Sequence, residues 1–377
     1  MSTDENPEEE TAFAKTLAEA RPVKPLLTHF LVVANLTAFV VVGLAGGGFV
    51  LPDTTVYLEW GANYAPAISN GEYWRLLSAA FLHFGLDHLL FNLWALWELG
   101  RLVERVQGRI AFLAIYFGAA VCGNFASSYW NGDLVISAGA SGAIFGLAGA
   151  QAAFLLLDGD AVPEAVLKRL AKSLLGFVGY SLFLGYVRPG IDNSAHIAGL
   201  GAGFVLGLLL VRPLEPMRGM MLDRLAMAVG GITLVCWMGW ASFPEFQHDW
   251  RAELPARRAI DHFMREGNRL GERGRATWKV QFELPRRELE RRVELELLAG
   301  WRAMVDRLAP VVAPPNTRQE RRLNLALEFA RLKVRENEVY LMAVRERSAE
   351  RFKEGDALVR EGNKALYRFE ATFERDG

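Results

Sequence analysis

The first two thirds of the chain alternates long apolar stretches with short polar ones, whereas the last third mixes apolar and charged residues. Seven stretches approach the roughly 20 apolar residues that a helix needs to cross a bilayer. They cover residues 26–48, 84–100, 110–128, 140–157, 170–187, 195–211 and 223–243. The pattern therefore predicts an all-α polytopic membrane protein with seven membrane-spanning helices.

Residues 244–377 show a different pattern. Apolar residues recur there at spacings of three and four among charges, near 250–272, 284–308 and 317–375, as in helices with one buried face. Prolines interrupt this pattern at 310, 314 and 315, and Asn316 or Thr317 is suited to cap the last helix. We expect a helical, charged, soluble domain, interpreted as a small bundle or a coiled-coil surface for a protein partner.

Composition supports this division of the chain. It has 377 residues, 51% of them hydrophobic, and 28 of its 42 Lys and Arg residues follow residue 250. We expect a cytoplasmic segment at 1–25, a six-helix core at 26–211, a loop and seventh span at 212–243, and the soluble domain at 244–377. The acidic N-terminus lacks the positive start of a cleaved signal peptide, and Cys122 and Cys236 lie in apolar runs that favour packing over a disulfide.

The distribution of positive charge predicts the orientation. Lys and Arg, which favour the cytoplasmic side in short loops, precede the first stretch and follow the second, fourth and sixth, and they are scarce in the alternate connections. The N-terminus is then cytoplasmic. With seven spans the soluble domain is extracytoplasmic, as in a protein of a bacterial inner membrane, and no nucleic-acid partner is expected there.

Four polar residues in the apolar stretches share one depth near the outer face. His88 and Asn92 lie four apart in the second stretch, Ser141 opens the fourth, and His196 opens the sixth. Polar groups at membrane depth are costly and usually face the bundle interior. Ordinary packing or structural hydrogen bonding explains any one of them but does not require their common depth.

Glycines indicate which spans touch. Gly199 and Gly203 follow His196, and Gly142 follows Ser141 as the first of a second set of small residues. Such stripes let two membrane helices approach closely. If the fourth and sixth spans pack through them, Ser141 lies beside His196; helix packing alone is the simpler alternative explanation for these small residues.

A serine beside a histidine can perform acyl transfer, because the imidazole takes the proton as the hydroxyl attacks a carbonyl. The developing oxyanion would then accept hydrogen bonds from the Asn92 amide, the His88 ring and the Ser141 backbone N–H. Asp87 and Asp192 are close in sequence, but neither needs to face the site. We therefore interpret these residues as a Ser–His dyad.

The surroundings of this dyad need no metal or cofactor. Gly139 and Gly142 flank the serine and would let backbone and substrate come close. The tail shows no metal ligands and no phosphate loop, and we expect the reaction of the dyad to proceed without a metal or a cofactor.

Three motifs resemble those of the rhomboid intramembrane serine proteases: HFGLDHLLFN from His83 to Asn92, GASG around Ser141, and AHIAGLGAGFVLG around His196. The resemblance covers roughly residues 26–211. It implies that Ser141 is the nucleophile and His196 the general base. His88 and Asn92 match the side chains that stabilise the oxyanion.

The same resemblance implies supporting roles. His83 is similar to a histidine that supports the first outer loop, and Phe145 to an aromatic that packs on the catalytic imidazole. Trp74 and Arg75 resemble a tryptophan–arginine motif of that loop, and Glu104 a structural acid at the inner end of the second span. The seventh span resembles a six-plus-one arrangement with the extra helix at the C-terminal end, and the family implies no function for the tail.

These observations predict an intramembrane serine endopeptidase that cleaves transmembrane segments of other membrane proteins near the outer face, through an acyl-enzyme. The alternative is a catalytically silent relative that binds membrane clients; such relatives lose the serine or the histidine, and this chain keeps both. A small-solute transporter would place its site at the membrane midplane between broken helices, whereas this polar cluster lies near one face.

Overall fold

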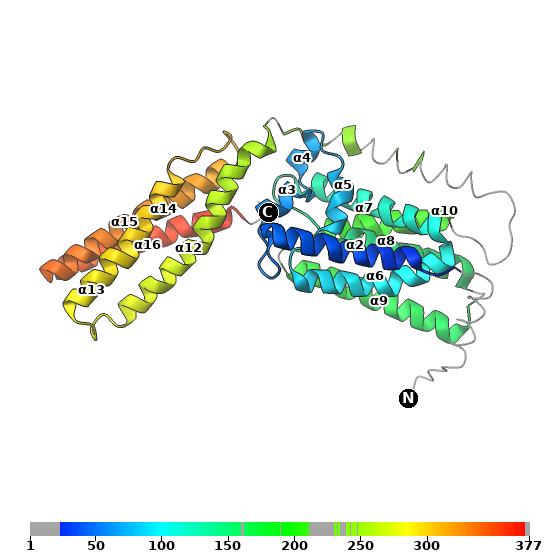
Figure 1. The fold of residues 1–377 in the computed structure, drawn as a ribbon, viewed down its shortest axis with the longest axis horizontal. Coiled ribbons are helices and arrows are strands. Elements are labelled where there is room, and N and C mark those ends of the chain that lie inside the picture. Colours follow the sequence, from blue (N-terminus) through cyan, green and yellow to red (C-terminus); the bar gives the residue numbers. More distant parts are fainter. Residues whose placement is uncertain are drawn as a thin grey trace. The chain divides into compact units, whose positions relative to one another are not determined.

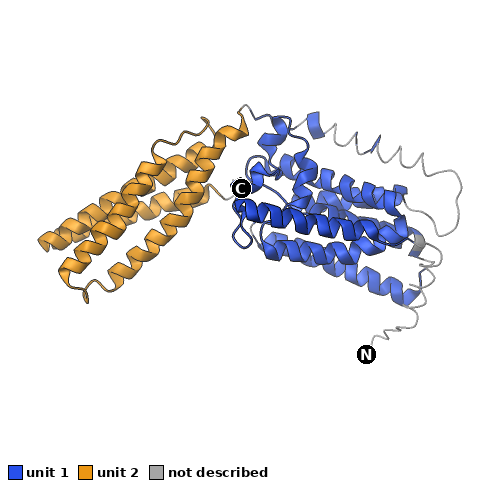
Figure 2. Cartoon of the chain, in the orientation of Figure 1, with its two compact units in different colours: residues 1–246 blue, residues 247–377 orange. Residues whose placement is uncertain are grey.

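The computed structural model describes residues 23–159, 162–188, 190–210, 230–231, 233, 239–241, 243–246 and 248–373. These residues form helices, with one isolated bridge between Asn63 and Ser137. The chain divides into two compact units, residues 1–246 and 247–377 (Figure 2). The prediction of an all-α protein is confirmed, and each unit is described by itself.

The first unit is a bundle of apolar helices (Figure 1). In its described part, four continuous helical segments are long and apolar enough to cross a membrane: α2 (Leu26–Val42) with η1 (Gly43–Gly47), α7 (Arg109–Asn131), α9 (Glu164–Val187) and α10 (Asn193–Leu210). A helix pair bent by 96° adds another candidate span, made of α5 (Arg75–Ser78), η2 (Ala79–Phe81) and α6 (Leu86–Gln107). The shorter apolar helix α8 (Ser141–Asp158) completes the set that corresponds to the first six predicted stretches.

Helices α6 and α9 extend farthest beyond their predicted stretches. Helix α6 continues to Gln107 because Glu104, which interrupts the apolar pattern, is fully buried and accepts hydrogen bonds from the backbone N–H groups of Leu27 (3.0 Å) and Thr28 (2.8 Å). Helix α9 begins at Glu164, with its charged first turns exposed. The predicted seventh span, residues 223–243, lies mostly outside the described residues.

Helix α8 occupies the centre of the first unit. Its residues from Gly142 to Gln151 are all buried, and it packs against α6, α7, α9 and α10. A helix that is small and apolar on every side has no face that requires water, so it is stable when surrounded by other helices. The helix with the candidate nucleophile at its first residue is therefore held on several sides.

Short helices connect α2 to α5 at one end of the bundle. They are α3 (Thr54–Glu59) and α4 (Ala65–Ser69). The buried Arg75 guanidinium donates to the carbonyl groups of Leu58 (2.6 Å) and Ala62 (3.0 Å), and it forms an ion pair with Glu72. The arginine of the tryptophan–arginine motif thus gives hydrogen bonds to buried carbonyl groups at the end of α3 and just after it.

The second unit is a bundle of amphipathic helices (Figure 1). Trp301 is its largest fully buried side chain, and Phe263, Leu323 and Phe369 belong to the same core. The helices are η4 (Trp250–Glu253), α12 (Leu254–Lys279), α13 (Arg286–Arg292), η5 (Val293–Leu298), α14 (Ala299–Leu308), α15 (Arg318–Glu346) and α16 (Ala349–Ala371).

The prediction of one helical segment over residues 317–375 is wrong in one respect. The chain breaks between α15 and α16, where Arg347 adopts a left-handed conformation with φ of 54°. The Ser348 hydroxyl then accepts a hydrogen bond from the N–H of Arg351 at 3.3 Å and caps α16. An apolar pattern that continues across a turn does not reveal such a break.

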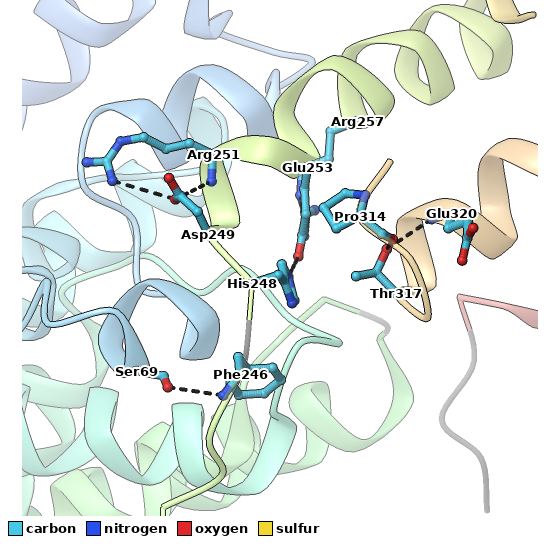
Figure 3. Close-up of polar contacts among 10 residues, drawn as sticks. All are labelled: Ser69, Phe246, His248, Asp249, Arg251, Glu253, Arg257, Pro314, Thr317 and Glu320. Carbon is cyan, nitrogen blue, oxygen red and sulfur yellow. Dashed lines mark hydrogen bonds and ion pairs between the residues drawn. The ribbon is translucent and has the colours of Figure 1, made fainter. Parts of the chain in front are cut away.

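Polar contacts define the ends of several elements (Figure 3). Thr317, one of the two suggested caps, accepts from the N–H of Glu320 at 3.2 Å. The buried Glu253 carboxylate pairs with His248 and accepts two hydrogen bonds from Arg257, at 2.7 and 3.0 Å. Within the first unit, the N–H of Phe246 donates to the Ser69 hydroxyl at 3.1 Å.

Candidate active site

Ser141 and His196 head two helices that pack closely together. Ser141 is the first residue of α8, and His196 is in the first turn of α10. A Cβ atom placed on Gly199 would lie 2.9 Å from the carbonyl carbon of Gly142 and closer still to its oxygen. The prediction that these two spans pack through glycines is confirmed, because no side chain separates their backbones at this level.

The contact continues along both helices. A Cβ on Gly203 would collide with the backbone of Gly146, and one on Gly207 would lie 2.7 Å from the Cα of Ala150. Three successive contacts of this kind fix the rotation and the separation of α8 and α10. The serine and the histidine at their heads are therefore held at the same end of the same helix pair.

Phe145 orients the imidazole of His196. The two rings are parallel within 4° and their centroids are 4.3 Å apart. His196 is 6% exposed, and its Nδ1 has no hydrogen-bond partner among the described residues. The ring is thus held by stacking. Ser141 lies one helical turn before Phe145 and is only half-buried.

His88 joins this group from α6, but the contact of Asn92 is local. A Cβ on Gly139 would lie 2.9 Å from Nε2 of His88 and 3.6 Å from Oγ of Ser141, so the ring and the hydroxyl face the same backbone position. Asn92 is buried, and its amide donates to the carbonyl of His88 at 2.9 Å. This hydrogen bond uses one of the two amide protons of Asn92.

The two glycines around Ser141 differ in what they require. Gly139 has φ of 138°, and the His88 ring leaves no room for a side chain, so both backbone and space demand glycine there. Gly142 would place a Cβ 3.5 Å from the nearest atom, the carbonyl oxygen of Ala195, which is ordinary contact. Helix packing therefore does not itself exclude a small side chain at Gly142.

His83 supports the backbone next to the serine. It is fully buried, it accepts from the N–H of Ala140 at 3.5 Å, and its ring meets the edge of His88 with centroids 5.2 Å apart. This geometry agrees with a structural, hydrogen-bonded histidine. Among the described residues, no group of three or more His, Cys, Asp or Glu side chains could hold a metal ion.

Sequence reasoning missed a polar network centred on Asp192, which lies directly before α10. Its carboxylate accepts from the Ser127 and Ser194 hydroxyls, from the amide of Asn131 (3.3 Å) and from the N–H of Ala195 (3.2 Å). From the sequence we expected only that Asp192 need not face the site, and this network was not predicted. Its one sequence signal is an acid four residues before His196, at the position of a helix cap.

Burial alone would raise the pKa of the Asp192 carboxyl. Hydrogen bonds from Ser127, Ser194, the Ala195 backbone and Ser137 outweigh this effect and hold the pKa below its usual value. The carboxylate is therefore ionised at neutral pH and acts as an acceptor for all of these donors.

Comparisons with known proteins point to one family. Residues 70–213 match the family model of the Rhomboid domain. The chain is 36% identical over 190 residues to rhomboid protease GluP of Bacillus subtilis, which covers 50% of this chain but only 36% of that protein. It is 31% identical over 169 residues to the putative rhomboid protease YdcA of the same organism, covering 44% of this chain and 83% of the relative. Rhomboid-like protease 2 of Toxoplasma gondii is 32% identical over 213 residues, covering 55% and 74%.

The chain belongs to the rhomboid family. It is an integral, multi-pass membrane protein, as its apolar helices and its relatives indicate. The names of the relatives support a protease function within the membrane.

Proposed function

We propose that this protein is an intramembrane serine endopeptidase that uses a Ser141–His196 dyad. The observation that carries the proposal is the glycine contact between α8 and α10, with the His196 ring stacked on Phe145 at one end of it. The substrates are transmembrane segments of other membrane proteins, cut near the outer face.

The reaction follows from the groups present. His196 accepts the proton of the Ser141 hydroxyl while Oγ bonds to the substrate carbonyl carbon. The resulting oxyanion accepts hydrogen bonds from the Ser141 backbone N–H, the His88 ring and the Asn92 amide. Collapse breaks the C–N bond, the imidazolium protonates the leaving amine, and water then hydrolyses the acyl-serine ester by the same proton transfers.

The proposal extends to the remaining parts of the chain. Residues 26–211 are the protease core, 1–25 a cytoplasmic segment, 212–243 a loop and seventh span, and 244–377 an extracytoplasmic helical domain for a protein partner. His83, Gly139, Gly142, Phe145, Gly199 and Gly203 support the dyad, and neither a metal nor a cofactor takes part.

Purified protein in proteoliposomes with single-span model substrates tests the chemistry. We expect cleavage near the outer end of the substrate helix and labelling by a fluorophosphonate, both lost in Ser141→Ala and His196→Ala. The two substitutions should be non-additive because the residues act as one unit. Ser181→Ala is the matched control: the hydroxyl of this buried serine on α9 has no partner among the described residues, so cleavage and labelling should persist.

The alternative is a catalytically silent protein that binds membrane clients. It predicts that correctly folded wild-type protein neither cleaves any model substrate nor reacts with the fluorophosphonate. Labelling that persists in Ser141→Ala would instead move the nucleophile to another residue.

A further inference from the structure

Asp192 caps the helix that carries His196. Its carboxylate accepts from the backbone N–H of Ala195 at 3.2 Å and from the hydroxyl of Ser194, and its carbonyl accepts from the N–H of His196 at 3.3 Å. This is the position of an N-cap residue, whose side chain satisfies an N–H group in the first helical turn. His196, which carries the imidazole, therefore lies one helical turn beyond this cap.

The same carboxylate is also held by a second helix. On α7, Ser127 donates its hydroxyl to Oδ2, and Asn131 donates its amide to Oδ1 at 3.3 Å. These two donors lie one turn apart and are 2% and 3% exposed. A helix cap needs only local bonds, so the additional bonds do something else: they fix the start of α10 against α7.

The C-terminal half of α7 also anchors the loop that leads to Ser141. The Ser128 hydroxyl donates to the side-chain oxygen of Asn63 at 2.9 Å. Asn63 and Ser137 exchange two backbone hydrogen bonds, at 2.8 and 2.9 Å. Ser137 is four residues before Ser141, so the segments that enter α8 and α10 are both tied to this helix.

Close packing continues this arrangement within the bundle. A Cβ on Gly123 of α7 would lie 2.8 Å from the carbonyl oxygen of Ala195 and 3.5 Å from the Cα of Gly142. These two neighbours directly precede His196 and follow Ser141. Helix α7 therefore contacts the backbone next to both Ser141 and His196, while it contributes no side chain to the proposed reaction.

We propose that Asp192 is a positioning residue, which holds the first turn of α10 against α7 and so keeps His196 in place beside Ser141. This inference rests on the proposed function of the dyad. Asp192 acts through hydrogen bonds to neighbouring groups, so its loss should slow the chemical step more than it weakens substrate binding.

The test compares Asp192→Ala with Asp192→Asn in the full-length protein in proteoliposomes. Asp192→Ala should lower kcat by about 10²-fold, the loss that a misplacement of about 1 Å can cause, while KM stays within about threefold. The Asn amide can still accept from the Ala195 N–H and donate to the Ser127 oxygen. Asp192→Asn should therefore retain kcat to within about tenfold of the wild type.

Two further variants separate positioning from loss of stability. Asp53→Ala removes the cap of α3, where the Asp53 carboxylate accepts from the N–H groups of Thr55 and Val56, and it should lower Tm without the loss of kcat. Ser127→Ala keeps the local cap but removes one bond to α7, and it should lower kcat by about tenfold. This variant also serves if Asp192→Ala does not fold.

Wild-type kcat in folded Asp192→Ala or in Ser127→Ala would overturn the proposal. So would a loss in Asp192→Asn equal to that in Asp192→Ala, because the charge and not the position would then matter. Hydrogen exchange at the start of α10 separates this outcome from failure of the proposed function. If backbone amides at the start of α10 exchange faster in Asp192→Ala but no fluorophosphonate labels the wild-type protein, Asp192 has its positioning role and the dyad chemistry is rejected. If exchange is unchanged in Asp192→Ala, the positioning role is rejected.

Discussion

Replacing Gly199 with alanine tests whether backbone contact between α8 and α10 holds the site together. The added Cβ would lie 2.9 Å from the carbonyl carbon of Gly142 and 3.2 Å from its Cα. Carbon atoms prefer a separation of about 3.5–4.0 Å, and the carbonyl oxygen of Gly142 lies closer still to the added Cβ, so the two backbones must move apart by about 1 Å. The obstacle is backbone, which cannot rotate away as a side chain could.

This displacement has two measurable consequences. Overpacking of this kind costs about 1–3 kcal/mol of stability, and a shift of about 1 Å between reacting groups can cost 10²-fold in rate. We expect Gly199→Ala to lower both the Tm in detergent and the cleavage of a single-span substrate in proteoliposomes. His196 moves away from Ser141 with its helix, although Gly199 has no chemical role.

Gly201 provides the matched control on the same helix. It is exposed, and a Cβ there would meet no atom within 4 Å. Gly201→Ala should leave activity unchanged and stabilise the helix slightly, by up to about 0.5–1 kcal/mol. If Gly199→Ala is as active and as stable as Gly201→Ala, close approach of α8 and α10 does not hold the dyad together.

Four other predictions address different parts of the chain. His88→Ala and Asn92→Ala should each lower kcat by on the order of 10²–10³-fold, the usual effect of removing one oxyanion donor; normal kinetics in both variants would reject these donors. Glu104→Ala leaves buried donors at the start of α2 unpaired and should lower the unfolding free energy by about 3 kcal/mol, because a hydrogen bond to a charged group contributes about 1.5–3 kcal/mol. An unaltered midpoint of chemical denaturation would contradict the capping role. Burial raises the pKa of the Glu336 carboxyl, and a neighbouring lysine opposes this only in part, so the folded state binds the proton more tightly than the unfolded state and loses stability as pH rises from 4.5 through the folded pKa. The Tm of Glu336→Gln should therefore gain on that of the wild type between pH 4 and pH 7, and a constant Tm difference would refute this. With seven spans, Ser348→Cys in a cysteine-free background should react with a membrane-impermeant maleimide in intact cells, and protection until lysis would contradict an extracytoplasmic second unit.

Much of the helical architecture could be predicted because membrane helices leave a strong signal in the sequence. The first six apolar stretches correspond to helices, and the glycines after Ser141 and His196 correctly indicated which pair touches. The ends were less predictable. Helix α6 extends beyond its apolar stretch because buried Glu104 finds its partners on α2, which lies far away in the sequence.

The residues that surround the candidate site were harder to predict than the candidate site residues themselves. Ser141 and His196 are unusual in apolar surroundings, so each is conspicuous without knowledge of the fold. Asp192 lies in a short connection, where the direction of a side chain depends on backbone angles that the sequence pattern does not specify. Its donors Ser127 and Asn131 are ordinary polar residues near the end of α7. They can bond to Asp192 only because α7 and α10 lie side by side in the fold.

Ser141 and His196 should differ from Asp192 in which substitutions they tolerate, for a physical reason. The proposed reacting residues are set by chemistry, and few side chains can replace a nucleophile or a base. The positioning residues are set by geometry, and any group that accepts from the N–H of Ala195 and also bonds to Ser127 can hold the start of α10. Asparagine meets this condition and alanine does not, so the dyad should tolerate no substitution while Asp192 tolerates one.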